Sequence, residues 1–321
     1  MKFLSASKLN FEDQALALFY DQSARIETYK QFIKYLKIDP KTISKIEDIP
    51  FLPIELFKTH TVFDRNKSNK ICFTSSGTSG MSSSKHYVAD LEIYKASFLN
   101  AFQIFFGPPK DYCFIALLPS YLEREGSSLI YMVDALMQAS SHPENGYYLR
   151  DYEALTNKLQ QLEDKHQKTI LWGVSYALLD LIAFKQLNLK HTLVIETGGM
   201  KGTRQEMTKE DFHQRLKQGL GVNTICSEYG MTELLSQAYS KGHGFYDCPP
   251  WMRILIRDVN DPKAFLKEGQ TGGINIIDLA NIDSCAFIAT QDLGKFNADE
   301  SFSVLGRFDN ADVRGCNLLV Q

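Results

Sequence analysis

The spacing of apolar positions changes along this chain, and each change marks a change of predicted secondary structure. Over residues 8–38 they recur every three or four residues, which predicts helix, and Pro40 ends that region. Further on, mainly apolar runs predict buried strands at Tyr112–Leu118, Thr169–Trp172, Thr192–Ile195 and Asn223–Cys226. Around them, helices are predicted at Asp90–Phe105, Ser127–Ser140, Asp151–His166, Tyr176–Lys185 and Arg204–Gln218.

The pattern changes again near Pro249. Beyond it, strands separated by turns are predicted at Arg253–Arg257, Gly273–Leu279, Ala286–Thr290 and Phe302–Leu305. We therefore expect an α/β fold with layered, mostly parallel sheets covered by helices, and a smaller antiparallel β-subdomain toward the C-terminus. The expected division is residues 1–248 for the α/β core with its N-terminal helical segment, and residues 249–321 for the β-rich part.

Composition narrows the class of protein. Of the 321 residues, 44% are hydrophobic and 23% are charged, as in ordinary globular proteins. The net charge of −3 gives no case for nucleic-acid binding, and no apolar stretch approaches the roughly 18 residues of a membrane span. The six cysteines are scattered without a Cys-x-x-Cys pair, which argues against the usual zinc sites and a disulfide framework. A cytoplasmic location is expected.

Residues 74–84 form a run in which ten of eleven residues are Ser, Thr or Gly, closing on Lys85. Such a run offers hydroxyls, close-approaching backbone N–H groups and one cation, which suits phosphate binding. A solvated linker is the alternative. Apolar residues at 71–73 and 87–88 flank the run and favour a strand–loop–strand instead. It is not a Walker A loop, because the Gly-Lys-Ser/Thr spacing is missing.

A second candidate segment, Ser227–Glu233, directly follows a predicted strand, where α/β sheets bind ligands. In it Tyr229 could stack on a base, Thr232 could bind a phosphate, and Glu233 could bind Mg²⁺. The alternative is a helix N-terminus capped by Thr232.

Two further candidates lie near the C-terminal end of the chain. Asp292, expected in a turn after a strand, could accept both hydroxyls of a ribose, although Asp is also an ordinary turn residue. Arg307, in a Gly-Arg-Phe-Asp segment, could pair with a phosphate.

The order and spacing of these segments resemble the AMP-forming adenylating enzymes, which include acyl-CoA synthetases, luciferases and peptide-synthetase adenylation domains. The resemblance implies an ATP site that binds the nucleotide through Ser75, Ser76, Gly77, Thr78, Ser79, Gly80, Lys85, Gly198, Gly199, Tyr229, Gly230 and Asp292. It gives Thr232, Glu233 and Arg307 catalytic roles, with Glu233 holding Mg²⁺, and makes Gly306–Asp309 a hinge.

A narrower resemblance is to the acyl-protein synthetases, known from the fatty-acid reductase of bacterial luminescence, and to the related phenylacetate-CoA ligases. Pro50–Glu55, Glu228–Leu234 and the terminal Arg314-Gly-Cys carry it. One departure is that Ser83-Ser84-Lys85 replaces the usual Pro-Lys. Another is that the chain stops twelve residues after Asp309, so we expect the C-terminal lid with its catalytic lysine to be absent.

This resemblance implies a reaction. ATP and a carboxylic acid, expected to be a fatty acid, give acyl-AMP, and the acyl group then moves to the thiol of Cys316 for delivery to a reductase or acyltransferase. A tail thiol without a role is the alternative for Cys316. A ligase that uses coenzyme A as the acceptor and a non-catalytic nucleotide-binding subunit are the alternative functions.

Overall fold

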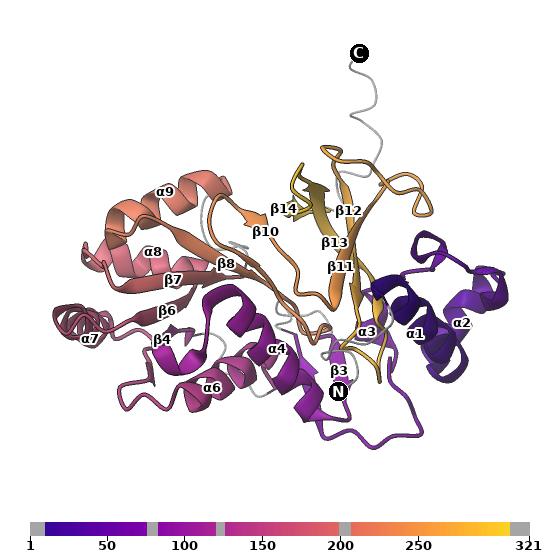
Figure 1. Cartoon of the computed structure of the whole chain (residues 1–321), viewed down its shortest axis with the longest axis horizontal. Helices are drawn as coiled ribbons and strands as arrows, with labels where there is room; N and C mark the ends of the chain where they lie inside the picture. Colours follow the sequence, from indigo (N-terminus) through magenta and orange to yellow (C-terminus); the bar gives the residue numbers. More distant parts are fainter. Residues whose placement is uncertain (1–9, 76–82, 120–125, 199–206, 309–321) are drawn as a thin grey trace, which may run out of the picture.

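The computed structural model describes residues 10–75, 83–119, 126–198 and 207–308. Two sheets stand side by side, each with its own helices, and a short hairpin lies between them near the bottom of the view (Figure 1). The predicted α/β fold with a C-terminal antiparallel sheet is confirmed.

The first sheet is mostly parallel and has the strand order β5-β4-β6-β7-β8-β9. Its strands are β4 (Cys113–Leu117), β5 (Gly146–Tyr147), β6 (Thr169–Val174), β7 (Thr192–Thr197), β8 (Ile225–Tyr229) and β9 (Ala238–Ser240). Every pair is parallel except β8 with β9. Strands β4, β6 and β8 are buried throughout, because helices cover both faces and leave no side facing water.

The helices of this sheet form two layers (Figure 1). On one face lie α4 (Leu91–Phe106) and α6 (Ser128–Ser140), and on the other α8 (Ser175–Phe184) and α9 (Lys209–Leu220), while α7 (Tyr152–Asp164) precedes β6. Four of these five helices begin at a polar side chain that accepts a bond from a first-turn N–H group, namely Asp90, Ser127, Asp151 and Thr208. For α4, α6 and α7 the observed start lies one residue after the predicted one, which is the capping residue. The predicted start at Arg204 is wrong, because Thr208 caps α9 and the helix begins at Lys209.

The second sheet is antiparallel and has the order β10-β14-β13-β12-β11, with β1 added in parallel beside β13. Its strands are β1 (Leu52–Pro53), β10 (Phe245–Tyr246), β11 (Met252–Arg257), β12 (Gly272–Asp278), β13 (Phe287–Phe296) and β14 (Phe302–Arg307). Strand β13 continues through Asp292, which pairs in register with Arg307. The prediction that Asp292 lies in a turn is therefore wrong, because its polar neighbours conceal a long strand.

The N-terminal helices α1 (Phe11–Arg25) and α2 (Glu27–Tyr35) pack against this antiparallel sheet. The rings of Phe19 and Tyr29 each lie 6.1 Å from the ring of Phe287. Gln22 Nε2 donates to the carbonyls of Asn281 and Ile282, at 2.8 and 3.1 Å. The first and last thirds of the chain thus share one core, and a domain boundary at residue 248 stays a prediction.

The remaining elements are short. Strands β2 (Ile71–Thr74) and β3 (Lys85–Val88) form the hairpin, and α3 (Leu56–Thr59) packs beside β3. Single turns of 3₁₀ helix lie at η1 (Pro40–Thr42), η2 (Ile46–Asp48) and η3 (Pro109–Asp111). Within the described ranges, no helix has the length and apolar character needed to cross a membrane.

One buried carboxylate fixes the segment between the two sheets. Asp278, at the end of β12, is 0% exposed. It accepts bonds from the N–H groups of Leu235, Ser236 and Ala280 and from the hydroxyl of Ser236, at 2.6–3.1 Å. Burial raises the pKa of Asp278, and these hydrogen bonds offset part of that rise.

We therefore expect Asp278→Ala to lower the free energy of unfolding by about 3 kcal/mol, because it leaves buried donors without an acceptor. Asp278→Asn keeps one acceptor oxygen and should lose about half as much. Urea unfolding measures both, with the exposed Asp13→Ala as a control. If Asp278→Ala unfolded like that control, the carboxylate would not hold the segment.

Candidate functional site

Two candidate residues from separate segments, Tyr229 and Arg307, both bind the carboxylate of a third, Asp292. The hydroxyl of Tyr229, at the end of β8, donates to Asp292 Oδ2 at 2.8 Å. Arg307 Nε donates to Asp292 Oδ1 at 2.9 Å. The N–H group of Asp292 in turn donates to the hydroxyl of Thr290 at 3.1 Å. The contact therefore joins the parallel sheet to β13 and β14 of the antiparallel sheet.

The surroundings of Tyr229 keep its hydroxyl protonated. Burial raises the pKa of Tyr229 well above its ordinary value, and the neighbouring charge of Asp292 raises it further. Its ring also lies 5.9 Å from that of Tyr246 and 5.6 Å from that of Phe302. Each oxygen of Asp292 has one bond and keeps further acceptor capacity, so the carboxylate can still receive hydroxyl groups of a ligand.

Glu233 lies in the turn that follows β8. Its side chain is buried, and this burial raises the pKa of its carboxyl, while a hydrogen bond from Ser84 and the charges of Arg307 and Lys58 favour ionisation. Residues 230–237 form turns and loop without a helix, so the alternative in which Thr232 caps a helix is wrong. This turn places Glu233 against the β2–β3 hairpin.

The strands predicted on either side of the Ser/Gly run are present and pair as β2 and β3. Ser75 N donates to Ser84 O at 3.1 Å, and Ser84 N donates to Ser75 Oγ at 2.9 Å, closing the two strands toward the loop. Lys85 is exposed whereas Ser84 is buried. Ser76, Gly77, Thr78, Ser79 and Gly80 lie outside the described residues, so the phosphate-binding role of the loop stays a prediction.

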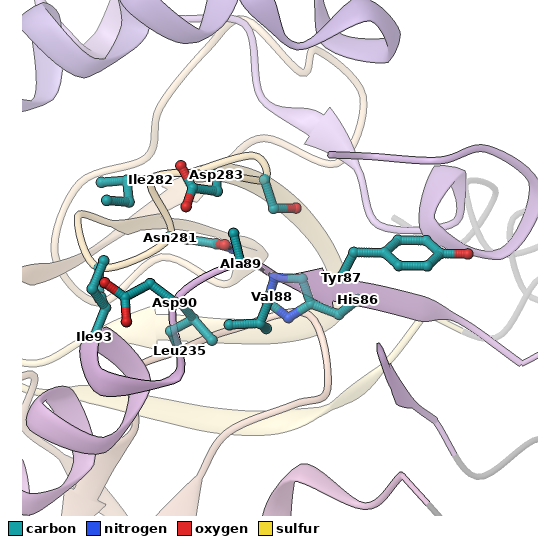
Figure 2. A pocket seen from close by; sticks show the side chains of 12 residues that line it. His86, Tyr87, Val88, Ala89, Asp90, Ile93, Leu235, Asn281, Ile282 and Asp283 are labelled. Carbon is teal, nitrogen blue, oxygen red and sulfur yellow. Dashed lines mark hydrogen bonds between the residues drawn. The ribbon is translucent and has the colours of Figure 1, made fainter. Parts of the chain in front are cut away.

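His86 joins the hairpin to the turn that carries Thr232 and Glu233. It is 0% exposed, its Nδ1 lies 2.7 Å from Thr232 O, and its Nε2 lies 3.0 Å from Asn281 Oδ1. Asn281 Nδ2 donates to the carbonyl of Glu233 at 2.9 Å. Because a carbonyl only accepts, Nδ1 carries a proton. Figure 2 shows His86 and Asn281 on the wall of a small pocket between β3, the start of α4 and residues 280–284.

Burial lowers the pKa of His86, and its bonds to Thr232 and Asn281 raise it only in part. Asn281 Oδ1 also only accepts, so the two bonds together require a proton on each ring nitrogen. The ring connects the two segments. Sequence reasoning assigned His86 no partner, because Thr232 and Asn281 lie 146 and 195 residues away along the chain.

Gly198 follows β7 at the carboxyl edge of the parallel sheet. Its φ of +78° is one that favours glycine, and its carbonyl accepts from Ser175 Oγ at 2.8 Å. Beside it, Glu196 is buried and bonded to Lys209. Burial would raise the pKa of Glu196, but the charge of Lys209 and a bond from His213 lower it to about 2. Sequence reasoning missed this ion pair.

Glu228 is a second buried carboxyl, which sequence reasoning placed in the motif without a role. It accepts a bond from the hydroxyl of Thr197. Burial raises the pKa of Glu228 to about 7, since that hydroxyl only partly offsets it. A Cβ added to Gly230 would collide with Glu228 Oε1 and lie 3.1 Å from Cγ of Gln237. A side chain at this position would therefore displace the carboxyl of Glu228.

Gly199 and Cys316 also lie outside the described residues. In the described part of the chain, no group of three or more His, Cys, Asp and Glu residues is arranged to hold a metal ion. Mg²⁺ in nucleotide enzymes commonly takes one or two carboxylates together with phosphate oxygens. The single buried carboxyl of Glu233 fits that mode.

One protein family matches part of this chain. Residues 5–96 match the model of the family "Acyl-protein synthetase, LuxE". The predicted resemblance to the acyl-protein synthetases is confirmed over these residues, which make up less than a third of the chain. No curated protein matches the sequence.

Solved structures share the fold. MatB from Rhodopseudomonas palustris with bound ATP is 18% identical, with a TM-score of 0.58 over 77% of this chain and 49% of that one. A 2-hydroxyisobutyryl-CoA ligase in complex with 2-HIB-AMP and CoA is 13% identical, with a TM-score of 0.72 over 93% of this chain and 67% of that one. A long-chain-fatty-acid-CoA ligase (FadD1) from Archaeoglobus fulgidus is 14% identical, with a TM-score of 0.54 over 76% of this chain and 52% of that one. This chain spans about half the length of MatB.

The raised pKa of Glu228 gives the stability a defined pH dependence. The folded protein binds this proton more tightly than the unfolded chain, so the stabilisation is complete below pH 4.5 and is lost as the pH rises through about 7. Glu228→Gln cannot ionise. Its stability relative to the native protein should therefore rise by about 1–3 kcal/mol from about pH 5 to about pH 8 in urea unfolding. Parallel pH curves for the two proteins would contradict this, and the exposed Glu153→Gln is the control.

Substitutions of His86 should separate its two contacts. His86→Leu removes both and should lower the free energy of unfolding by about 2–4 kcal/mol, because buried oxygens lose their partner. His86→Asn keeps a donor near the Nδ1 position and should lose less. Urea unfolding ranks the variants, and equal stabilities of Leu and Asn would show that the Thr232 contact carries no weight.

Proposed function

We propose that this chain activates a carboxylic acid with ATP. A carboxylate oxygen of the acid attacks the α-phosphorus of ATP, the bond from that phosphorus to pyrophosphate breaks, and acyl-AMP forms. The observation that carries the proposal is the junction of Tyr229, Asp292 and Arg307, since residues from three predicted nucleotide-binding segments meet at one carboxylate.

Each group has a proposed task. Asp292 accepts the ribose hydroxyls with its remaining lone pairs, and Tyr229 holds that carboxylate and presents its ring to the base. Arg307 offsets charge on the α-phosphate during attack. Glu233 would hold Mg²⁺, which supplies charge neutralisation for the pyrophosphate leaving group. The Ser/Gly loop, Lys85, Gly198 and Gly199 complete the nucleotide site.

The acyl group then passes, in this proposal, to Cys316. Its thiolate attacks the acyl carbon, the bond from that carbon to the AMP oxygen breaks, and AMP leaves as a thioester forms. We expect a fatty acid as substrate, an acyl reductase or acyltransferase as the receiving protein, and a cytoplasmic location. The family match over residues 5–96 supports the protein thiol as acceptor.

Coenzyme A is the second candidate acceptor. A structural neighbour was solved in complex with an acyl adenylate and CoA, which favours this alternative over a non-catalytic subunit.

Exchange of labelled pyrophosphate into ATP tests the activation step. We expect exchange that depends on an added carboxylic acid, and Glu233→Gln should reduce it at least ~100-fold, because the metal loses its carboxylate. Urea unfolding of Glu233→Gln confirms that the variant is folded. Absence of exchange with acids of every chain length would refute the adenylating activity.

Intact mass after incubation with ATP, Mg²⁺ and acid tests the acceptor. We expect an acyl-sized increase that hydroxylamine removes and that Cys316→Ser abolishes, with pyrophosphate exchange unchanged in that variant. Cys285→Ser, which alters a buried thiol, is the matched control. If labelled acid appeared on coenzyme A at a rate unchanged in Cys316→Ser, the acceptor would be coenzyme A and not the protein thiol.

A further inference from the structure

Three buried polar atoms lack a hydrogen-bond partner in the described part of the chain. They are Nε1 of Trp172, Oε1 of Gln237 and the hydroxyl of Tyr239. The residues are 0%, 3% and 0% exposed. Buried polar atoms are nearly always paired, because leaving one unpaired forfeits its bonds to water. Three such atoms therefore call for a common explanation if they lie together.

The strand register places them on one face of the parallel sheet. Tyr239 is directly opposite Glu228, and Gln237 lies two residues before Tyr239 on the same side. Thr197, on the other side of Glu228, points the same way and bonds to it. Trp172 is opposite Ile195, which is two residues before Thr197 and so faces the same side.

Direct contacts agree with the register. The rings of Trp172 and Tyr239 have centroids 6.4 Å apart. Glu228 Oε1 and Cγ of Gln237 both lie against the same side of Gly230. Trp172, Gln237, Tyr239 and Glu228 thus lie on one face of the sheet, and we call these four residues the polar cluster.

Aromatic side chains of α4 pack against the polar cluster. The rings of Phe105 and Phe106, from α4, lie 5.3 and 5.2 Å from the ring of Tyr239. The cluster also lies toward the carboxyl ends of β7 and β8, directly before Tyr229. Ligands of α/β sheets bind at this edge.

We propose that the polar cluster binds a hydroxyl group on the chain of the acid substrate, so that the preferred substrate is a hydroxylated fatty acid. The inference rests on the proposed acid activation and specifies its substrate. A hydroxyl oxygen accepts from Trp172 Nε1–H, which can only donate, and its proton goes to Gln237 Oε1 or to Glu228. Tyr239 can act in either sense. The aromatic side chains of α4 beside the cluster are apolar, as the rest of the acyl chain requires.

A plain alkyl acid would leave the same polar atoms unpaired. Sites built to bond a substrate hydroxyl reject analogues that lack it far more strongly than apolar pockets reject one extra group. Octanoic acid should therefore be a poorer substrate than an octanoic acid hydroxylated at the α, β or terminal carbon. For the best of these positions we expect kcat/KM to be ~10–100-fold higher than for octanoic acid. This factor corresponds to the free-energy cost of leaving one buried polar group unpaired.

The first experiment tests whether the hydroxyl of Tyr239 is unpaired without substrate. Tyr239→Phe should then unfold at the same or a higher temperature than the native protein. Tyr29→Phe is the matched control, since Tyr29 is equally buried and its hydroxyl donates to Pro50 O at 2.7 Å, so its removal should lower the melting temperature. A comparable loss in Tyr239→Phe would mean that water or the rest of the chain already pairs this hydroxyl, and would overturn the proposal.

The second experiment measures acid-dependent pyrophosphate exchange with each octanoic acid for the native enzyme, Trp172→Phe and Gln237→Leu. We expect both variants to lose most of the preference for the hydroxylated acid, because the hydroxyl loses a bonding partner. Equal kcat/KM for all acids in the native enzyme, or an unchanged preference in both variants, would refute the polar cluster as a hydroxyl site. Absence of exchange with every acid would instead refute the acid activation itself.

Discussion

The buried carboxylate of Asp278 holds the turn after β8 against the end of β12, and the candidate site depends on that connection. The turn carries Thr232 and Glu233, and it has no helix or strand of its own to fix it. Its backbone N–H groups at Leu235 and Ser236 are satisfied by a side chain of the other sheet. Without that acceptor, the turn would have to place those N–H groups in water, and Glu233 would leave its position beside the hairpin.

Two carboxyl groups near this edge show how one sheet supports opposite protonation states. Glu196 on β7 faces α9 and is paired with Lys209, which keeps it ionised. Glu228 on β8 faces α4 and has only the hydroxyl of Thr197, so burial dominates and its pKa rises to about 7. Glu196 is opposite Ser227, the residue before Glu228, so the side chains of Glu196 and Glu228 point to opposite faces of the sheet. Different charged groups lie on each face. The difference arises from what covers each face, since both groups are buried.

The sequence predicted those features of the fold and the site that depend on local pattern. The apolar runs and capping residues gave the parallel sheet and its helices, and the motif spacing gave the residues around Asp292. It could not show that Asp292 lies within a strand, because the polar residues around it resemble a turn. It also could not pair His86 with Asn281, or Asp278 with Leu235, since these contacts join residues far apart in sequence. Glu228 was visible within its motif, but its environment depends on Thr197 from another strand.

Successive side chains of β8 point to opposite faces of the sheet, and this divides the candidate site into two sides. Tyr229 faces Asp292, Tyr246 and Phe302 on one side of the sheet, and Glu228 faces Tyr239 and α4 on the other. Two reactants that bind on opposite faces of one strand can meet only where the strand ends. Gly230 is the residue at that point, and a side chain there would collide with Glu228. The same glycine that allows the carboxyl of Glu228 to pack therefore also leaves the edge open where a nucleotide on one side and an acid on the other would come into contact.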